Sequence, residues 1–138
     1  MSVPPDPARA VRRWVERAEQ DLRNAEHTLM LREDCPLDTV CFHAQQCAEK
    51  YLKALLTHRS VDFPRTHNLE ILAGLLPDGP RLGVELVELA ALTRFAIEGR
   101  YPGDWEAATR GEADSCVATA HRVRDAVRAL LAPDLLGP

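Results

Sequence analysis

Arginine and aromatic residues come together in a part of the chain that is rich in turn-forming residues. Arg94 and Arg100 are followed by Tyr101 and Trp105, with Pro102-Gly103 between the two aromatic residues. A guanidinium can bind a phosphate through two parallel hydrogen bonds, and an aromatic ring can stack on a nucleic-acid base. The stretch therefore indicates a site for a nucleotide or for RNA. The alternative is an Arg–Glu pair on the surface, with the rings packed in a loop.

A second group of polar residues lies in a stretch of strong helix formers between residues 45 and 53. Gln46, Lys50 and Lys53 are spaced i, i+4 and i+7, so they share one face of a helix beside its apolar stripe. Such a face can hold an anionic ligand or a partner protein. The alternative is a solvated face on which Glu49 and Lys53 form an i, i+4 ion pair.

A third group is Arg65-Thr66-His67, which precedes another apolar run. We expect Thr66 to cap a short helix, because its side chain can accept a hydrogen bond from the first turn. The positive end of that helix, with Arg65 and His67 beside it, is a candidate anion site. The alternative is plain capping, with His67 packed against the rest of the protein.

Motifs of metal-dependent and nucleotide-dependent enzymes are missing from the sequence. There is no G-x-G-x-x-G, no phosphate-binding loop before Lys-Ser/Thr and no H-E-x-x-H, and no two histidines are spaced i, i+4. We therefore expect neither a cofactor nor a metal site. No C-x-x-C pair occurs, so we expect the cysteines to be small core residues. They are Cys35, Cys41, Cys47 and Cys116.

Apolar residues recur at steps of three and four, which predicts helices that would position these groups. We expect helices over 8–31 and 36–58, a short one after Thr66, one over 81–98, and a last one from Trp105 or Thr109 to 131. Five helices with short connections predict an all-α, up-and-down bundle. The first helix has its apolar stripe at Val11, Trp14, Val15, Ala18, Leu22, Ala25 and Leu29.

The length of 138 residues suits one domain over 1–138, with a helical core over about 8–131 and short disordered ends. The net charge of -4 argues against a protein that coats nucleic acid, which would carry a strong basic excess. No apolar run reaches the roughly 18 residues of a membrane span, and residues 1–14 lack the apolar core of a signal peptide. We therefore expect a cytoplasmic protein without membrane contact.

Four segments together resemble the HEPN domain family, and the resemblance covers about residues 14–131. They are A-E-Q-D-L at 18–22, F-H-A-Q-Q-C-A-E-K-Y-L-K-A-L-L at 42–56, T-H-N-L at 66–69 and R-Y-P at 100–102. The resemblance implies an all-α bundle similar to the substrate-binding domain of kanamycin nucleotidyltransferase. It also implies a homodimer and a partnership with a minimal nucleotidyltransferase, in the manner of a toxin–antitoxin pair.

Many members of this family are metal-independent ribonucleases that use an Arg and a His separated by four to six residues. In such a pair the Arg binds the phosphate and the His handles protons. Arg100 would be the candidate catalytic residue here, but Trp105, Glu106 and Ala107 occupy the three positions at which the His is expected. The sequence therefore departs from the ribonuclease motif.

Three hypotheses follow from the resemblance and this departure. The first is a dimeric subunit that partners a minimal nucleotidyltransferase and binds nucleotide or RNA phosphate near Arg100. The second is a metal-independent ribonuclease toxin with a divergent active site. The third is a non-catalytic interaction scaffold.

Overall fold

The computed structural model describes residues 6–77, 79–96 and 106–136, and this part of the chain contains helices and no strand. The expected all-α helical bundle is therefore confirmed. The helices of the described part are α1 (Pro7–Leu29), α2 (Leu37–His58), α3 (Leu69–Gly74), the 3-10 helix η1 (Gly79–Leu82), α4 (Leu86–Thr93), α5 (Arg110–Leu130) and the 3-10 helix η2 (Pro133–Leu135).

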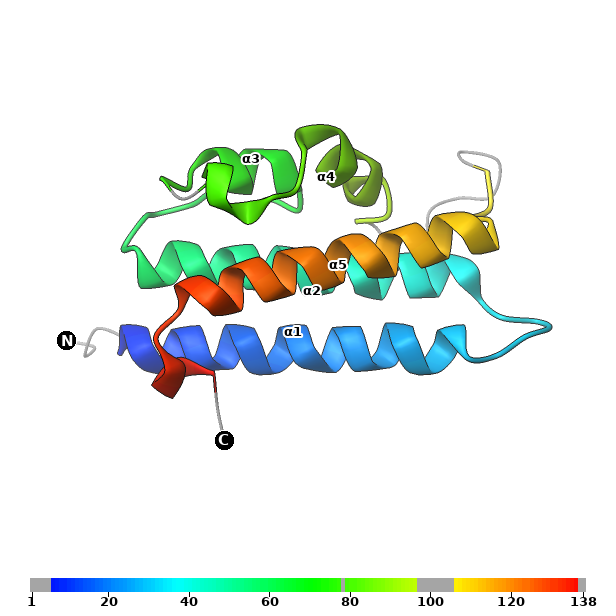
Figure 1. Cartoon of the computed structure of the whole chain (residues 1–138), viewed down its shortest axis with the longest axis horizontal. Helices are drawn as coiled ribbons and strands as arrows, with labels where there is room; N and C mark the ends of the chain where they lie inside the picture. Colours follow the sequence, from blue (N-terminus) through cyan, green and yellow to red (C-terminus); the bar gives the residue numbers. More distant parts are fainter. Residues whose placement is uncertain (1–5, 78, 97–105, 137–138) are drawn as a thin grey trace.

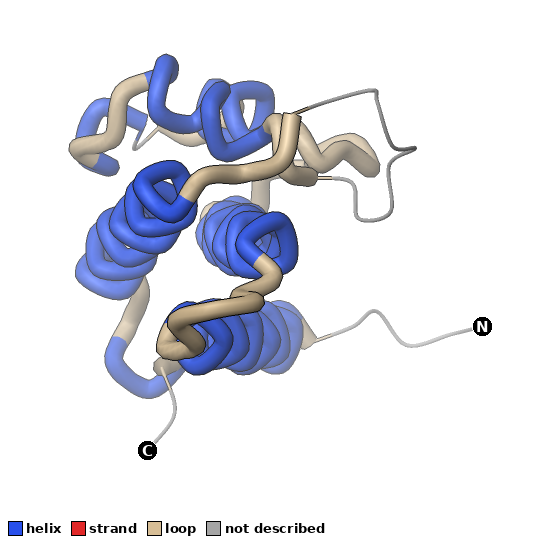
Figure 2. The backbone as a smooth tube through the Cα atoms, turned by 90° about the vertical axis from the view of Figure 1, so that its right-hand side faces the viewer, coloured by secondary structure: helices blue, strands red, loops and turns tan. Residues whose placement is uncertain are grey.

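The three long helices α1, α2 and α5 run lengthwise through the molecule, and the short helices α3 and α4 lie together on one side of them (Figure 1). The end view shows the same grouping, with α3 and α4 stacked over α2 and α5 (Figure 2). Helix α2 is central, because it contacts α1, α3, α4 and α5. Its neighbours cover so much of its surface that even Gln45, Glu49 and Lys53 are buried.

Alanines allow α1 and α2 to pack closely. Ala18 and Ala25 of α1 and Ala44 and Ala48 of α2 are fully buried, and their small side chains let close-packed backbones approach one another. The predicted apolar stripe of the first helix is confirmed, with Trp14 and Leu29 half-buried at its margin. The fully enclosed members of that stripe are Val11, Val15, Ala18, Leu22 and Ala25.

Specific caps fix where the long helices begin. The Asp6 carboxylate accepts a hydrogen bond from the Ala8 N–H at 3.1 Å, and Pro7 occupies the first turn, where its missing N–H costs nothing. At the start of α5, Thr109 Oγ1 accepts from the Glu112 N–H at 3.1 Å while the Glu112 carboxylate accepts from the Thr109 N–H at 3.0 Å. This reciprocal capping box begins α5 four residues after Trp105.

Arg110 ties the start of α5 to the end of α1. Its guanidinium donates to the Leu31 carbonyl at 2.9 Å and to the Leu29 carbonyl, so it satisfies acceptors that the end of a helix leaves open. Positive charge at this position also opposes the negative end of the α1 dipole. The contact holds the loop at 30–36 against α5.

The structure corrects two predicted helices. The helix expected over 81–98 is instead η1 followed by α4, because Gly83 adopts a left-handed φ of 63° between them and ends the first segment. Asn68, and not Thr66, caps α3: its Oδ1 accepts from the Ile71 N–H at 3.0 Å. Thr66 lies in the preceding turn, where its hydroxyl accepts from the Asn68 N–H at 3.1 Å.

Candidate functional site

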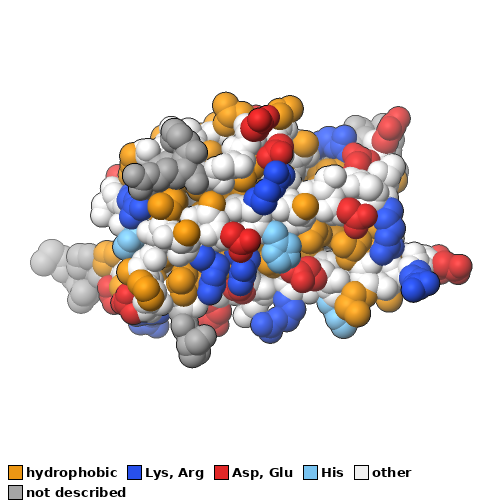
Figure 3. Space-filling model, in the orientation of Figure 1, with side chains coloured by type: hydrophobic (Ala, Val, Ile, Leu, Met, Phe, Trp, Pro, Cys, Tyr) orange, Lys and Arg blue, Asp and Glu red, His pale blue; other side chains and the backbone are white. Residues whose placement is uncertain are grey.

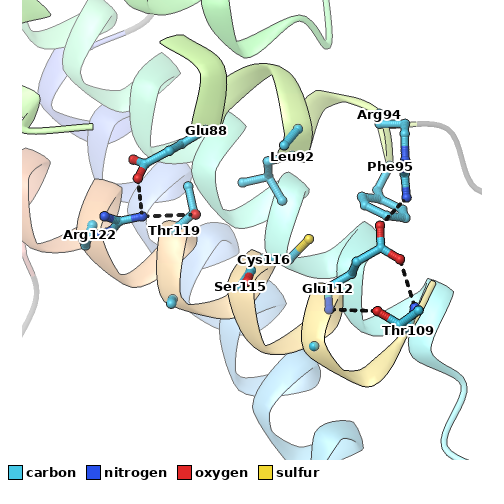
Figure 4. Close-up of a pocket in the computed structure, with 13 residues that line it drawn as sticks. Glu88, Leu92, Arg94, Phe95, Thr109, Glu112, Ser115, Cys116, Thr119 and Arg122 are labelled. Atoms are coloured by element: carbon cyan, nitrogen blue, oxygen red, sulfur yellow. Dashed lines mark hydrogen bonds and ion pairs between the residues drawn. The ribbon is translucent and has the colours of Figure 1, made fainter. Parts of the chain in front are cut away.

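A groove of about 700 Å³ lies between α4 and α5. Its floor is apolar, because Leu92 and Phe95 from α4 and the turn after it, and Cys116 from α5, are buried beneath it. Two ion pairs lie at opposite ends of this floor (Figure 4). The groove is lined by Glu88, Ala91, Leu92, Arg94, Phe95, Thr109, Gly111, Glu112, Ser115, Cys116, Ala118, Thr119 and Arg122.

Arg94 and Glu112 form one end of the groove. Arg94 Nη2 lies 2.6 Å from Glu112 Oε2, and the guanidinium also stacks 4.6 Å from the centre of the Phe95 ring. The backbone hydrogen bond from Thr109, together with the Arg94 guanidinium, holds the pKa of Glu112 below its usual value. Glu112 is therefore ionised at neutral pH and faces a cation that a ligand phosphate could also reach.

Arg122 and Glu88 form the other end. Arg122 Nη2 lies 3.1 Å from Glu88 Oε1 and donates to Thr119 Oγ1 at 3.3 Å. The Arg122 side chain is half exposed, as is that of Arg94. The groove thus has a solvent-accessible guanidinium at each end of an apolar floor.

Arg100, Tyr101 and Trp105 lie outside the described residues. The described chain on either side of them contributes Phe95 and Thr109 to the same end of the groove. Ahead of α5, the Ala108 N–H donates to the Asp38 carboxylate of α2 at 2.8 Å, which fixes the start of α5 against the bundle. Glu106 and Ala107 are exposed.

The structure brings the predicted site residues Lys53 and His67 together, on one buried carboxylate. Glu49 accepts from Lys53 Nζ at 3.0 Å and lies 2.8 Å from His67 Nδ1. Gln45 Nε2 donates to Glu49 at 3.3 Å and to the His67 carbonyl at 2.9 Å. The proposed i, i+4 pair of Glu49 and Lys53 is present, but it is buried rather than solvated.

Aromatic rings complete the environment of Lys53. Its Nζ lies 5.6 Å from the centre of the Trp14 ring and 5.8 Å from that of Phe63, distances at which a ring face attracts a cation. Arg65, the remaining member of its predicted group, is exposed. Around α3, the Leu69 N–H donates to Thr93 Oγ1 at 3.1 Å, so a protein side chain occupies part of the predicted anion site.

Lys50 points to a different neighbour from Lys53. Its Nζ lies 2.5 Å from Asp21 Oδ2, and the other oxygen of that carboxylate lies 2.9 Å from His43 Nδ1. Gln46 donates to Gln45 Oε1 at 2.7 Å. The predicted common face of Gln46, Lys50 and Lys53 is therefore divided between contacts within α2 and a contact with α1.

A polar cluster around Glu19 was not among the predicted site residues. Arg124 Nε and Nη2 donate to the two oxygens of Glu19 at 2.8 and 3.0 Å, and the Tyr51 hydroxyl donates to the same carboxylate at 2.7 Å. Burial pushes the pKa of Glu19 upward, but the hydrogen bonds from Arg124 and Tyr51 outweigh it and hold that pKa below its usual value. Arg124 and Arg128, spaced i, i+4 on α5, were the available sequence signal.

The cysteines are placed in the interior, with Cys41, Cys47 and Cys116 buried and Cys35 half-buried. A hydrogen bond with Cys116, and burial, raise the pKa of the Cys41 thiol, and burial raises that of Cys47. Both thiols are therefore protonated and unreactive as nucleophiles at neutral pH. Across the described ranges, no three His, Cys, Asp or Glu side chains are grouped as metal ligands. No helix in these ranges is both long and apolar enough to span a membrane.

Comparison with known proteins agrees with the architecture and the motifs. The family model of the HEPN domain matches residues 11–130. The crystal structure of TT1696 from Thermus thermophilus is 29% identical in sequence, with a TM-score of 0.73 over 88% of this chain and 98% of that one. That of ST0689, described as an archaeal HEPN homologue, is 27% identical, with a TM-score of 0.66 over 87% and 96%.

No curated protein sequence matched the chain. The family match nevertheless extends from the first turns of α1 to the last residue of α5, and the two solved structures share the helical architecture over almost their whole length. The chain belongs to the HEPN domain family.

Proposed function

We propose that this protein binds the phosphate of a nucleotide or an RNA strand in the groove between α4 and α5. The observation that carries the proposal is the arrangement of Arg94 and Arg122 at opposite ends of one apolar floor. Guanidinium groups recognise phosphate oxygens, and an apolar floor suits a nucleobase or ribose. The groove volume of about 700 Å³ falls within the usual range for small-ligand sites.

The ion pairs at the two ends do not prevent such binding. Exposed Arg–carboxylate pairs contribute about 0–1 kcal/mol, whereas a hydrogen bond to a charged group contributes about 1.5–3 kcal/mol. An incoming phosphate can therefore displace Glu112 from Arg94 at small cost. The pairs hold the two guanidinium groups in position until a ligand arrives, which lowers the ordering cost of binding.

We assign Arg100 as the principal phosphate ligand. The support for this assignment is the R-Y-P segment of the HEPN resemblance and its place in the chain, between two residues that line the groove, Phe95 and Thr109. Tyr101 and Trp105 would contribute stacking surfaces. Because Trp105, Glu106 and Ala107 occupy the positions of the ribonuclease histidine, we propose binding without cleavage.

Calorimetric titration with AMP, ATP and a short single-stranded RNA tests this function. Arg100→Ala is expected to weaken binding about ten-fold or more, because a charge-assisted hydrogen bond is lost. Arg100→Lys is expected to recover only part of the affinity, since an ammonium group cannot bind bidentately. Arg17→Ala is the matched control: Arg17 is exposed on α1 and lines none of the described grooves. Unchanged affinity in a folded Arg100→Ala protein would contradict the assignment.

We further propose that the protein is a homodimer that partners a minimal nucleotidyltransferase. The family supports both expectations, and exposed apolar side chains on neighbouring helices α3 and α4 support a protein interface. Light scattering is expected to give twice the chain mass of 15.4 kDa, and a monomeric mass at micromolar concentration would contradict the dimer. Co-purification with the product of an adjacent nucleotidyltransferase gene tests the partner. The exposed side chains are Ile71, Leu75, Leu86 and Val87.

A further inference from the structure

A second groove, of about 600 Å³, lies along the outer face of α1. Leu135 and Leu136, at the end of the chain's last described turn, form its other wall. A shallower hollow of about 460 Å³ shares Gln20 and Arg23 with it and continues to Thr28 near the end of the helix. Together they form one track, the α1 track. It is lined by Arg9, Arg12, Arg13, Val15, Glu16, Glu19, Gln20, Arg23, Asn24, His27, Thr28, Leu135 and Leu136.

Helical periodicity places the basic residues of the track in a row. The arginines at 9, 12, 13 and 23 fall on the face of α1 opposite its buried stripe, and all four are exposed. At a rise of about 1.5 Å per residue, Arg9 and Arg23 are about 21 Å apart along the helix axis. Such a row suits an extended ligand with repeated negative charges.

The positive charge of the track is not neutralised by neighbouring residues. Within the described ranges, none of these four arginines forms an ion pair. Of the two carboxylates in the track, Glu19 is held by Arg124 and Arg128 of α5, which leaves Glu16 as the other. Basic and acidic side chains meet in this way along the strip between α5 and α1 (Figure 3). The track is therefore locally basic in a protein whose net charge is -4.

The remaining polar residues indicate what kind of anion fits. Gln20, Asn24 and His27 follow the arginines and provide hydrogen-bond donors and acceptors, which suit ribose hydroxyls and phosphate oxygens. The described residues that line the track include no Phe, Tyr or Trp on which a base could stack. Recognition there would depend on the backbone of a nucleic acid and not on its sequence.

We propose that the α1 track binds the sugar-phosphate backbone of an RNA strand, as a contact surface separate from the groove between α4 and α5. The choice of RNA over another polyanion rests on the proposed function, which supplies a nucleic-acid ligand for the same molecule. Arg12 and Arg13 contact phosphates, and each contact releases counterions when RNA binds.

The salt dependence of RNA binding tests the proposal. Fluorescence anisotropy with a short labelled single-stranded RNA gives the slope of log K against log salt concentration for the full-length protein. For single strands each phosphate contact contributes about 0.7 to that slope, so the double variant Arg12→Ala/Arg13→Ala is expected to reduce it by about 1.4. Its affinity at low salt is expected to fall about ten-fold or more. Alanine favours helices and both arginines are exposed, so the variant should keep its circular dichroism spectrum.

Arg17→Ala serves as the control, because it removes the same charge from the same helix outside the track. An unchanged slope in the double variant, or an equal reduction in Arg17→Ala, would overturn the proposal. Displacement of the RNA by polyglutamate at equal charge would also overturn it and point to an acidic protein. Arg100→Ala separates the two sites: if that variant alone loses RNA, the proposed function stands and the α1 track fails. If the double variant alone loses RNA, the α1 track stands and the assignment of Arg100 fails.

Discussion

Glu19 of α1 and Arg124 of α5 form a two-point ion pair between helices, and the two residues are 105 positions apart in the chain. Both carboxylate oxygens accept hydrogen bonds, at 2.8 and 3.0 Å. The pair joins the first and last long helices beside the central α2, whose Tyr51 donates to the same carboxylate. Because it is only partly buried, it contributes to stability while it also neutralises a carboxylate in the α1 track.

Glu19 predicts how stability changes in acid. Its pKa in the folded protein lies below the unfolded value near 4.5, so its contribution is fully present above that value. The contribution is lost as the pH falls below 4.5 through the folded pKa. Glu19→Gln is expected to lower stability at neutral pH by about 1 kcal/mol, as a partly exposed charged hydrogen bond would. It should also flatten the acid limb of the stability curve, measured by urea unfolding across pH. An acid limb as steep as that of the parent would contradict this role.

The buried pair of Glu49 and Lys53 predicts strong coupling between two substitutions. Glu49→Met alone leaves a buried ammonium without its carboxylate, which is expected to cost about 3–5 kcal/mol of unfolding free energy. The double variant Glu49→Met/Lys53→Met replaces both charges by apolar groups of similar length and is expected to recover most of that loss. Chemical denaturation of the two single variants and the double variant measures the coupling. Additive losses would show that the two side chains do not depend on one another.

Glu112 competes with ligand phosphate for Arg94. Glu112→Gln removes the competing charge, but a glutamine at this position can still complete the capping box with Thr109. We expect AMP or RNA to bind up to about five-fold more tightly, which corresponds to the roughly 1 kcal/mol of an exposed pair. Titration of the parent and the variant at the same salt concentration measures the gain. Weaker binding by a variant with normal thermal stability would place the ligand elsewhere.

The missing motif histidine predicts that the purified protein leaves single-stranded RNA intact. Trp105→His places an imidazole at the first position where the motif histidine is expected after Arg100. This variant is expected to produce metal-independent cleavage, because the general acid–base group is restored. Gel analysis of labelled RNA in the presence of a chelator measures it, with Trp105→Phe as the control that keeps an aromatic ring. Cleavage by the unmodified protein that Arg100→Ala abolishes would instead identify a divergent ribonuclease.

Local features of the sequence determined most of the helical architecture. The stripe from Val11 to Ala25 follows the helical period, and amphipathic helices with short connections must bury such stripes against one another. The motif segments were also sufficient to place the chain in the HEPN family. The length of the fourth helix was wrong because Gly83 was not identified as a left-handed turn. A single residue's φ is not encoded in hydrophobic period.

The tertiary structure alone decided which polar residues meet. Lys50 and Lys53 share one helix face by spacing, yet the first binds Asp21 across 29 residues and the second a carboxylate of its own helix. The groove between α4 and α5 and the α1 track likewise join segments that are distant in the chain. Periodicity reports one helix at a time, whereas an ion pair between helices depends on their register and separation. The sequence by itself therefore determined the helices and the family, and packing determined the partners of their charged residues.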